Sequence, residues 1–439
     1  MRGYRFPIIA AFVTCLLPTW SAKAVEFAGG TGEPNDPYQI ATAEQLVAIH
    51  ADYSLRGEHF VIVADIDLDP NLPGGSVFAK PILSLTTGSL DGRGHRILNL
   101  RMVSQGGMRT MSIGSDAVVR DVHFERVIID EDGSVLTSTN EGYIANCTVE
   151  GSACGVGLVL ENRGHIMNCS VVAQAGGTCG LADKNSGSIV FSHVGPGLAQ
   201  DGGLVRENSG AISDCYSTAD VFGESAAGGL VGTNSGSISR CYATGAVSVS
   251  ASPDAHHCSA AGLVGENSGT ISDCYALGAT SAAGAKYAYD YAGGLAGTNT
   301  GLVFHCYAAG MGGAGLIGDP YPGVVVNSYF LSPGDGGGSC NGFGIPLTDL
   351  QMRRQGSFIG WDFRGSSLDG SGEIWTMPQE GGYPVLAMIQ EPAFDGNGTA
   401  EDPYLIESAD QLLAIRRDVG ATYCLVDNID LQGRSFAYP

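Results

Sequence analysis

The chain has 439 residues, of which 66 are glycine, and only 15% of them are charged. Low charge together with 44% hydrophobic residues argues against disorder, and abundant glycine without a triplet period excludes collagen and indicates many tight turns. The formal net charge of −23 disfavours nucleic acid as a partner, because an acidic surface repels phosphate backbones.

The first 24 residues have the pattern of a secretory signal peptide. Arg2 and Arg5 precede a short apolar run, and the residues ending at Ala24 fit the small-x-small rule for cleavage. The alternative is a membrane anchor, but the apolar run is too short to span a bilayer comfortably. We therefore expect residues 1–24 to be removed, and the mature chain to be secreted or at the cell surface with no transmembrane segment.

Residues 25–88 are predicted to form an N-terminal capping module. Thr42 and Gln45 make a capping box that opens a short helix, and Leu46 and Ile49 give this helix an apolar face. A strand that ends in the letters DIDLD follows the helix. A repeat array exposes its core and its strand edges at each end, so we expect this module to cover the first end.

Residues 89–335 contain a repeat in which cysteine returns every 22 to 33 residues. Three residues before it stands Ile or Val, five before it Gly, and seven before it Asn. The asparagines are Asn140, Asn162, Asn185, Asn208, Asn234, Asn267 and Asn299, and the cysteines are Cys147, Cys169, Cys215, Cys241, Cys274 and Cys306. Ser192 and Ser328 replace the cysteine in two copies.

This period predicts one turn of a parallel β-solenoid per copy. It is too short for a pair of helices, glycine interrupts every potential helix, and three short strands with three turns fit the length. We therefore expect an all-β fold, a right-handed parallel β-helix of about ten rungs with small α/β capping modules at its ends. Rungs stacked at about 4.8 Å would give a rod of about 48 Å.

Equivalent side chains on successive rungs should form continuous columns. A buried Asn can hydrogen-bond backbone groups and the Asn of the next rung, and Cys serves as a small apolar residue. Glycine supplies a positive φ or a close approach of two backbones. Ile238 and Cys241 are three residues apart, so the chain must bend between them for both to face inward; Ala243 then points inward and Tyr242 outward.

The repeats resemble those of a known family in the stretches GLVGTNSGSISRCYATG, GLVGENSGTISDCYALG and GLAGTNTGLVFHCYAAG. These resemble GLUG-motif repeat proteins, which include secreted and surface proteins of bacteria. The resemblance is strong over residues 200–330 and weaker over 130–200; Ser192, Ser328 and Tyr321 depart from the pattern. It implies a β-helical surface protein, and it implies no reaction because no catalytic residue belongs to the motif.

Two segments follow the repeats. Residues 336–391 hold Trp361 and Trp375 and are predicted to close the end of the solenoid, with a ligand site as the alternative. Residues 392–439 are a second, truncated copy of the N-terminal module, in which 402–404 match 36–38. Ser408 and Gln411 make its capping box, and this copy resembles the start of another solenoid unit.

Two long rungs supply the candidate ligand site. Their extra residues precede the same position of neighbouring rungs, so the two loops should leave the same edge of the rod. The candidate ligand-binding residues are Asp254, His256, His257, Tyr287, Tyr289, Asp290 and Tyr291. Tyrosines with carboxylates suit a sugar, and neighbouring histidines with Asp could hold a metal, although adjacency is a weak signal. The alternative is two ordinary surface loops.

A tyrosine follows the cysteine position in five copies, at Tyr216, Tyr242, Tyr275, Tyr307 and Tyr329. Outward-pointing tyrosines would form an aromatic stripe that could bind glycan or protein, or that only stabilises the rod by stacking.

Neither the cysteines nor the carboxylates predict a bound cofactor. Stacked cysteines have a poor geometry for disulfides, so we expect mostly buried thiols, and their spacing matches no zinc motif. The carboxylates of residues 65–69 could attract calcium, but their spacing does not match an EF-hand, and turns and caps are their expected role.

These observations predict a non-catalytic secreted or cell-surface β-solenoid that acts as an adhesion, structural or glycan-contacting module. Its expected partner is a glycan or a surface protein, and its oligomeric state is left open. The alternative is a polysaccharide-degrading β-helix enzyme, a lyase or glycoside hydrolase. Such enzymes need paired carboxylates, or a base with calcium and Arg, on one outer face, and the sequence shows no such set.

Overall fold

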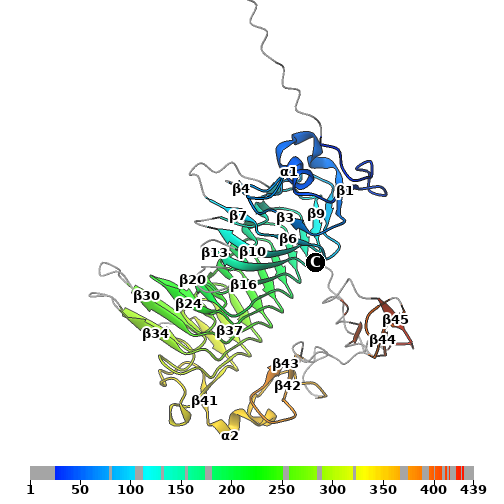
Figure 1. Ribbon diagram of the computed structural model, residues 1–439. Helices are drawn as coiled ribbons and strands as arrows, with labels where there is room; N and C mark the ends of the chain where they lie inside the picture. Colours follow the sequence, from blue (N-terminus) through cyan, green and yellow to red (C-terminus); the bar gives the residue numbers. More distant parts are fainter. Residues whose placement is uncertain are drawn as a thin grey trace, which may run out of the picture.

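The structure, a computed structural model, describes most of the chain. It covers residues 25–429 except 79–81, 104–111, 130–132, 154–156, 174–179, 251–256, 284–288, 320–322, 366–373, 388–394, 400, 408–410, 413–414, 416–421 and 427. The predicted signal peptide at 1–24 lies outside these residues. Strands from successive turns of the chain stack into parallel sheets that run along a rod (Figure 1).

Sheet 1 has twelve parallel strands. They are β1 (Tyr38–Ile40), β2 (His59–Ile62), β5 (Ser89–Asp91), β9 (Val118–Arg120), β12 (Tyr143–Ala145), β15 (His165–Met167), β18 (Ser188–Val190), β22 (Ala211–Ser213), β27 (Ser237–Ser239), β32 (Thr270–Ser272), β37 (Leu302–Phe304) and β39 (Val324–Val326). From β5 to β39 each strand belongs to one rung, which confirms the predicted parallel β-helix of ten rungs.

Sheet 2 has fourteen strands and lies beyond the next corner of each rung. They are β3 (Ile66–Asp67), β4 (Val77–Phe78), β6 (Arg96–Leu98), β7 (Arg101–Met102), β10 (His123–Ile129), β13 (Thr148–Ala153), β16 (Ser170–Ala173), β19 (His193–Val194), β23 (Tyr216–Ser217), β28 (Tyr242–Ala243), β33 (Tyr275–Ala276), β38 (Tyr307–Ala308), β40 (Tyr329–Leu331) and β41 (Ile345–Leu347).

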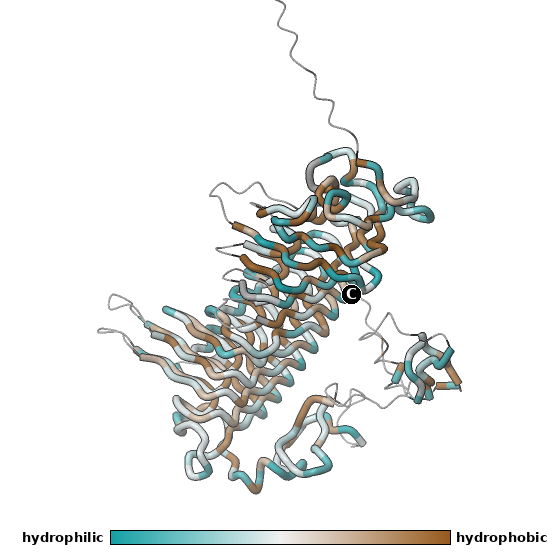
Figure 2. Tube along the Cα trace, viewed as in Figure 1, coloured by the Kyte–Doolittle hydropathy of each residue, from teal (hydrophilic) through white to brown (hydrophobic). Residues whose placement is uncertain are grey.

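Sheet 3 has eight strands, most of which end in the repeated asparagine. They are β8 (Ser112–Ile113), β11 (Thr137–Asn140), β14 (Val159–Asn162), β17 (Ala182–Asn185), β21 (Val205–Asn208), β26 (Val231–Asn234), β31 (Val264–Asn267) and β36 (Ala296–Asn299). Apolar residues recur at the same place of each rung along the rod (Figure 2).

Later rungs carry two additional small sheets, together called the fin. One consists of β20 (Leu198–Gln200), β24 (Asp220–Gly223), β29 (Val247–Ser250) and β34 (Thr280–Ala283); the other of β25 (Ala226–Gly228), β30 (His257–Ala261) and β35 (Tyr289–Gly293). The fin contains the described ends of both predicted loops, and it projects from one side of the rod (Figure 1).

The repeated asparagines form a buried ladder through the rod. The side-chain amide nitrogen of each donates to the amide oxygen of the next, from Asn140 to Asn299, at 2.7 Å in all six pairs. Asn234 also donates to the carbonyl oxygen of Gly236 at 3.3 Å. A Cβ at Gly236 would collide with the carbonyl oxygen of Gly210, so close approach of two rungs is the reason for this glycine.

The predicted corner between Ile238 and Cys241 is present. Arg240 has φ of 49°, and the residue before the cysteine position is left-handed in every rung from Asn99 to Asn327. Ala243 is buried and Tyr242 is half-buried on the outside, as predicted.

The stacked cysteines are buried thiols. All six are free, and the Cys241 thiol donates to the carbonyl oxygen of Ser239 at 3.1 Å, while the backbone N–H of Cys241 donates to the sulfur of Cys274 at 3.3 Å. Each sulfur therefore satisfies backbone groups at the corner, and the column packs in the core without disulfides.

The N-terminal residues cover the first rung. Helix α1 (Ala43–Ala51) opens at Thr42 with the predicted capping box to Gln45, and the short 3₁₀ helix η1 (Tyr53–Gly57) follows. Strand β2 then pairs with β5 and buries Phe60 and Ile62 over the solenoid core.

The residues after the last rung pack at its end and on its side. Strand β41 continues sheet 2 beyond β40. The segment containing η2 (Pro333–Asp335), α2 (Asp349–Met352), η3 (Gln355–Ser357), β42 (Trp375–Thr376) and β43 (Val385–Leu386) contributes Met352, Phe358, Trp361, Phe363, Trp375 and Leu386 to an aromatic cluster. This cluster covers Tyr275, Tyr307 and Tyr329 on the outer face of sheet 2.

Candidate functional site

One outward column of sheet 2 determines the character of its outer face. It is formed by the residue after the cysteine position: His123, Thr148, Ser170, His193, Tyr216, Tyr242, Tyr275, Tyr307 and Tyr329. The column is polar in its first half and aromatic in its second. Because Thr148 and Ser170 are small, the face is hollowed between His123 and His193.

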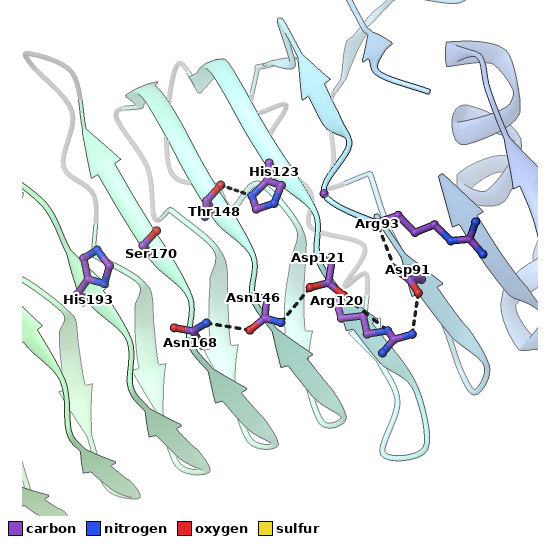
Figure 3. Close-up of a pocket in the computed structure, with 11 residues that line it drawn as sticks. Asp91, Arg93, Arg120, Asp121, His123, Asn146, Thr148, Asn168, Ser170 and His193 are labelled. Atoms are coloured by element: carbon purple, nitrogen blue, oxygen red, sulfur yellow. Dashed lines mark hydrogen bonds and ion pairs between the residues drawn. The ribbon is translucent and has the colours of Figure 1, made fainter. Parts of the chain in front are cut away.

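This hollow is a groove of about 560 Å³ across several rungs (Figure 3). Its lining residues are Asp91, Arg93, Gly94, Arg120, Asp121, His123, Asn146, Thr148, Asn168, Ser170 and His193. The floor comes from sheet 2, and one wall comes from the left-handed corners, whose polar side chains follow one another along the rod. The groove is thus rigid, because both elements are fixed by the stacking of the rungs.

Hydrogen bonds connect the wall into a continuous polar track. Asn168 donates to Asn146 and Asn146 donates to Asp121, each at 2.9 Å, and Arg120 contacts Asp91 at 2.7 Å and Asp121 at 3.8 Å. Two Asp and two Arg lie among the lining residues, so their charges cancel. The groove is therefore locally neutral on a chain whose formal charge is −23.

Both histidines of the groove have described partners. The Nδ1 atom of His123 lies 2.8 Å from Oγ1 of Thr148. The ring of His193 stacks on Tyr216 with a centroid distance of 4.6 Å, and burial lowers the pKa of His193, so this ring is neutral near pH 7. The groove consequently offers hydroxyl, amide and imidazole groups as hydrogen-bonding partners.

The tyrosines form a stack with little ring face open to a ligand. Centroids of Tyr216, Tyr242, Tyr275 and Tyr307 are 4.8, 4.9 and 5.1 Å apart, with interplanar angles of 10° or less. Each inner ring therefore uses both faces on its neighbours. The C-terminal cluster buries Tyr275, Tyr307 and Tyr329 and also packs against the half-buried Tyr242.

The groove lacks a free pair of carboxylates among its described lining residues. Asp91 accepts from the backbone N–H of Arg93 at 2.9 Å and from Arg120, and Asp121 accepts from Asn146. A glycosidase needs one carboxyl group as acid and another as base or nucleophile, both facing the substrate. The arrangement can bind polar groups through the hydroxyl, amide and imidazole side chains that line it.

The predicted loop site is described only in part. Asp254, His256 and Tyr287 lie outside the described residues. Strands β30 and β35 place His257 beside Tyr289, Cys258 beside Asp290 and Ser259 beside Tyr291.

Within the fin, two of the predicted ligand-binding residues, His257 and Asp290, have partners on the protein. His257 contacts Glu266 at 3.2 Å, and the Cys258 thiol donates to Asp290 at 3.1 Å. Burial, reinforced by this carboxylate, raises the pKa of the Cys258 thiol to about 12. The assignment of a ligand to these loops stays a prediction.

The carboxylates of residues 65–69 are engaged by the protein. The backbone N–H and the guanidinium of Arg96 lower the pKa of Asp65 to about 2, and Asp67 accepts from Asn99 at 2.7 Å and from the N–H of Asp69 at 3.0 Å. The described residues hold no cluster of three or more metal-ligating side chains. Across the same part of the chain, no helix has the length and apolarity needed to cross a membrane.

Sequence reasoning missed the groove, although its signal was present. The tyrosine column was found by reading the position after each cysteine; the same position in earlier rungs contains His193, Ser170, Thr148 and His123. The corner residues give a second signal, because Asp121, Asn146 and Asn168 precede the same anchor position.

Comparisons with known proteins agree with the repeat pattern. The model of the GLUG motif matches residues 223–249. The chain is 30% identical over 138 residues to halomucin of Haloquadratum walsbyi, which covers 29% of this chain and 2% of that protein. It is 31% identical over 160 residues to a protein of Evansella cellulosilytica named as a glycine-rich membrane protein, covering 32% of this chain and 18% of that protein.

A solved structure of a candidate immunoglobulin A1 protease from Bacteroides ovatus matches 82% of this chain and 95% of that chain, at 20% identity and a TM-score of 0.33, which is too low to assign fold or function. The stacked columns and the matched motif within them identify the chain as a GLUG-containing repeat protein.

Proposed function

We propose that the protein is a non-catalytic, surface-exposed β-helix that binds neutral oligosaccharides in the groove on sheet 2. The observation that carries this proposal is the groove itself, a rigid polar hollow with balanced charge. Export through residues 1–24 is part of the proposal. The names of two relatives, halomucin and a glycine-rich membrane protein, support a surface location, although the alignments cover only 2% and 18% of their lengths.

The lining fits a sugar better than it fits a charged ligand. Hydroxyls of Thr148 and Ser170 and amides of Asn146 and Asn168 can donate and accept, as sugar hydroxyls require. An anionic glycan would meet no net positive charge, because Asp91 and Asp121 offset Arg93 and Arg120.

The groove extends across several rungs, which favours an oligosaccharide over a single sugar as its ligand. A hydroxyl and an amide recur on two successive rungs, as Thr148 with Asn146 and Ser170 with Asn168, about 4.8 Å apart, so two successive sugar units can make similar contacts. A rigid site also loses little conformational entropy on binding, which supports affinity from modest contacts.

The test is a glycan array with the mature protein, followed by titration of the best neutral oligosaccharide. Thr148→Trp should fill the floor of the groove and weaken binding by at least about tenfold. Ser237→Trp places the same bulk on an exposed position of sheet 1 and should leave the affinity unchanged.

Two results would overturn the proposal. One is the absence of any neutral glycan that binds; the other is equal affinity of Thr148→Trp and the parent chain. A reducing-sugar assay on the same oligosaccharides completes the test, since steady release of sugar ends would show a hydrolase or lyase instead of a binding protein.

A further inference from the structure

The stack of rings on the outer face of sheet 2 ends at His193. Its imidazole lies on Tyr216 with a centroid distance of 4.6 Å and an interplanar angle of 7°, so it continues the parallel stack of tyrosines by one member. The next residue of the column is Ser170, which pairs in register with His193 and carries no ring. One face of the imidazole therefore contacts Tyr216, and the other is directed along the rod towards Ser170.

This second face of His193, called here the groove face, borders the hollow. Figure 3 shows His193 at one end of the groove, and the other lining residues all come from earlier rungs, whereas Tyr216 is not among the described lining residues. The groove thus lies on the side of the imidazole that is turned away from Tyr216. His123 stands at the opposite end, and its Nδ1 atom lies 2.8 Å from Thr148, so this ring directs an edge at the floor.

The spacing of the column leaves room for a flat ring beside the groove face. Stacked tyrosines follow one another at 4.8 to 5.1 Å, which matches the rise of about 4.8 Å per rung. His123 and His193 are three rungs apart, about 14 Å, and only the small Ser170 and Thr148 stand between them in the column. A ring bound at the level of Ser170 would take the place of the ring that this rung lacks.

We propose that the groove face of His193 is the platform on which the terminal sugar of the oligosaccharide lies, and that it selects an α-linked terminal glucose. This inference rests on the proposed function of the groove and specifies which neutral sugar the groove accepts. The face of an aromatic ring carries partial negative charge and attracts C–H groups, so contact with an apolar face of a sugar is favourable. Burial lowers the pKa of His193, so the ring is neutral near pH 7 and its face carries no cationic charge.

The direction of the groove determines the linkage of this sugar. The sugar ring lies flat on the imidazole, and the groove runs away from the imidazole face along the rod (Figure 3). An axial glycosidic oxygen leaves a pyranose ring across its mean plane, so it leads the chain along the groove towards Thr148. An equatorial oxygen leaves within the plane of the ring, towards the corner wall or out of the groove. In D-glucose the axial oxygen on C1 is that of the α anomer.

The stereochemistry of the other carbons determines the identity of the sugar. When the α oxygen is directed away from His193, the opposite face of the ring lies on the imidazole. In glucose this face presents the axial hydrogens on C2 and C4, whereas galactose places an axial hydroxyl there on C4 and mannose places one on C2. The hydroxyls of glucose on C2, C3 and C4 are equatorial and lie in the plane of the ring, where the floor supplies the hydroxyl of Ser170 and the wall the amide of Asn168.

Calorimetric titration of the mature protein with three trisaccharides tests this assignment. Maltotriose ends in an α-linked glucose. The second trisaccharide differs only at C4 of that terminal unit, which makes the unit galactose, and cellotriose has the same sugars as maltotriose with β linkages. We expect maltotriose to bind at least about fivefold more tightly than either of the others.

Two substitutions separate the ring face of His193 from its bulk. His193→Leu keeps a side chain of similar size without a flat ring and should weaken maltotriose binding about five- to tenfold, whereas His193→Phe keeps a ring and should stay within about twofold of the parent chain. In NMR titrations, the hydrogens on C2 and C4 of the terminal glucose should shift upfield with the parent chain and with His193→Phe, and not with His193→Leu, because the shift comes from a ring current. His165→Leu makes the same change on the outer face of sheet 1, away from the groove lining, and should leave the affinity unchanged.

Three results would contradict this inference. They are equal affinity for maltotriose and its C4 epimer, unchanged affinity in His193→Leu, and no binding of maltotriose by a groove that binds another neutral oligosaccharide. In each case, weaker binding of the oligosaccharide by Thr148→Trp would leave the proposed function of the groove intact. If no neutral oligosaccharide binds at all, the proposed function is wrong and the inference falls with it.

Discussion

At the scale of single residues, the asparagine ladder explains why the repeat tolerates so little variation at that position. Asn208 accepts from Asn185 and donates to Asn234, each at 2.7 Å, in the buried interior. Asn208→Ala leaves a donor on one rung and an acceptor on the next without partners, and we expect a loss of about 2–5 kcal/mol in the free energy of unfolding.

Urea denaturation monitored by circular dichroism measures this loss. Ser237→Ala, at an exposed position of the neighbouring rung, should change stability by less than about 0.5 kcal/mol. Equal effects of the two substitutions would show that the ladder does not stabilise the rod.

His193 predicts a specific dependence of stability on pH. Burial lowers its pKa in the folded state, whereas the unfolded chain binds the proton near the ordinary value of about 6.5. Below that pH the unfolded state holds more protons, so stability falls as pH falls. The parent chain should lose more stability between pH 7 and pH 5 than His193→Gln does, as measured by urea unfolding at both pH values; identical losses would contradict the prediction.

At the scale of elements, the segment over the tyrosine column depends on its tryptophans. Trp361 donates to the carbonyl oxygen of Asn327 at 2.8 Å and packs on Trp375 with a centroid distance of 4.3 Å. Trp361→Ala removes a buried aromatic ring and should weaken docking of the segment by about 3–5 kcal/mol. Limited proteolysis should then cut within residues 349–387 much faster than in the parent chain.

Spectroscopic titration of the Tyr329 phenol gives a second test of whether the segment stays docked. Burial raises the pKa of Tyr329, so release of the segment should move this phenol back toward its ordinary value of about 10. Ile359→Ala is the control, because Ile359 is 73% exposed beside Trp361. Similar proteolysis of both variants would mean that Trp361 does not hold the segment.

The sequence was sufficient to predict the rungs, because stacking places equivalent residues of successive rungs in continuous columns. A spacing of three between Ile238 and Cys241 required a bend, and the left-handed Arg240 provides it. The residues of the groove could be read from the same repeat positions, but the hollow itself depends on the relative size of side chains in two adjacent columns. The position of the C-terminal segment also escaped prediction, because which face needs covering depends on how far the tyrosines project.

At the scale of the whole molecule, rungs should be removable as units. Deleting residues 215–240 joins Asp214 to Cys241 and lets every column close again, with Asn208 bonding to Asn267. We expect a shortened chain with the same β-type circular dichroism and one cooperative transition. Deleting residues 215–227 removes half a rung and places apolar side chains outside, so that chain should unfold at much lower urea or aggregate during size-exclusion chromatography.

The outward column of sheet 2 has a consequence for how such a protein can change its specificity. The place of a residue within the repeat sets the direction of its side chain, and the number of its rung sets its height on the rod. A chosen chemical group can therefore be shifted along the axis in increments of about 4.8 Å by choosing which rung bears it. Point substitutions at this single repeat position are enough to change which side-chain groups contact a ligand, while the backbone of the rod stays the same.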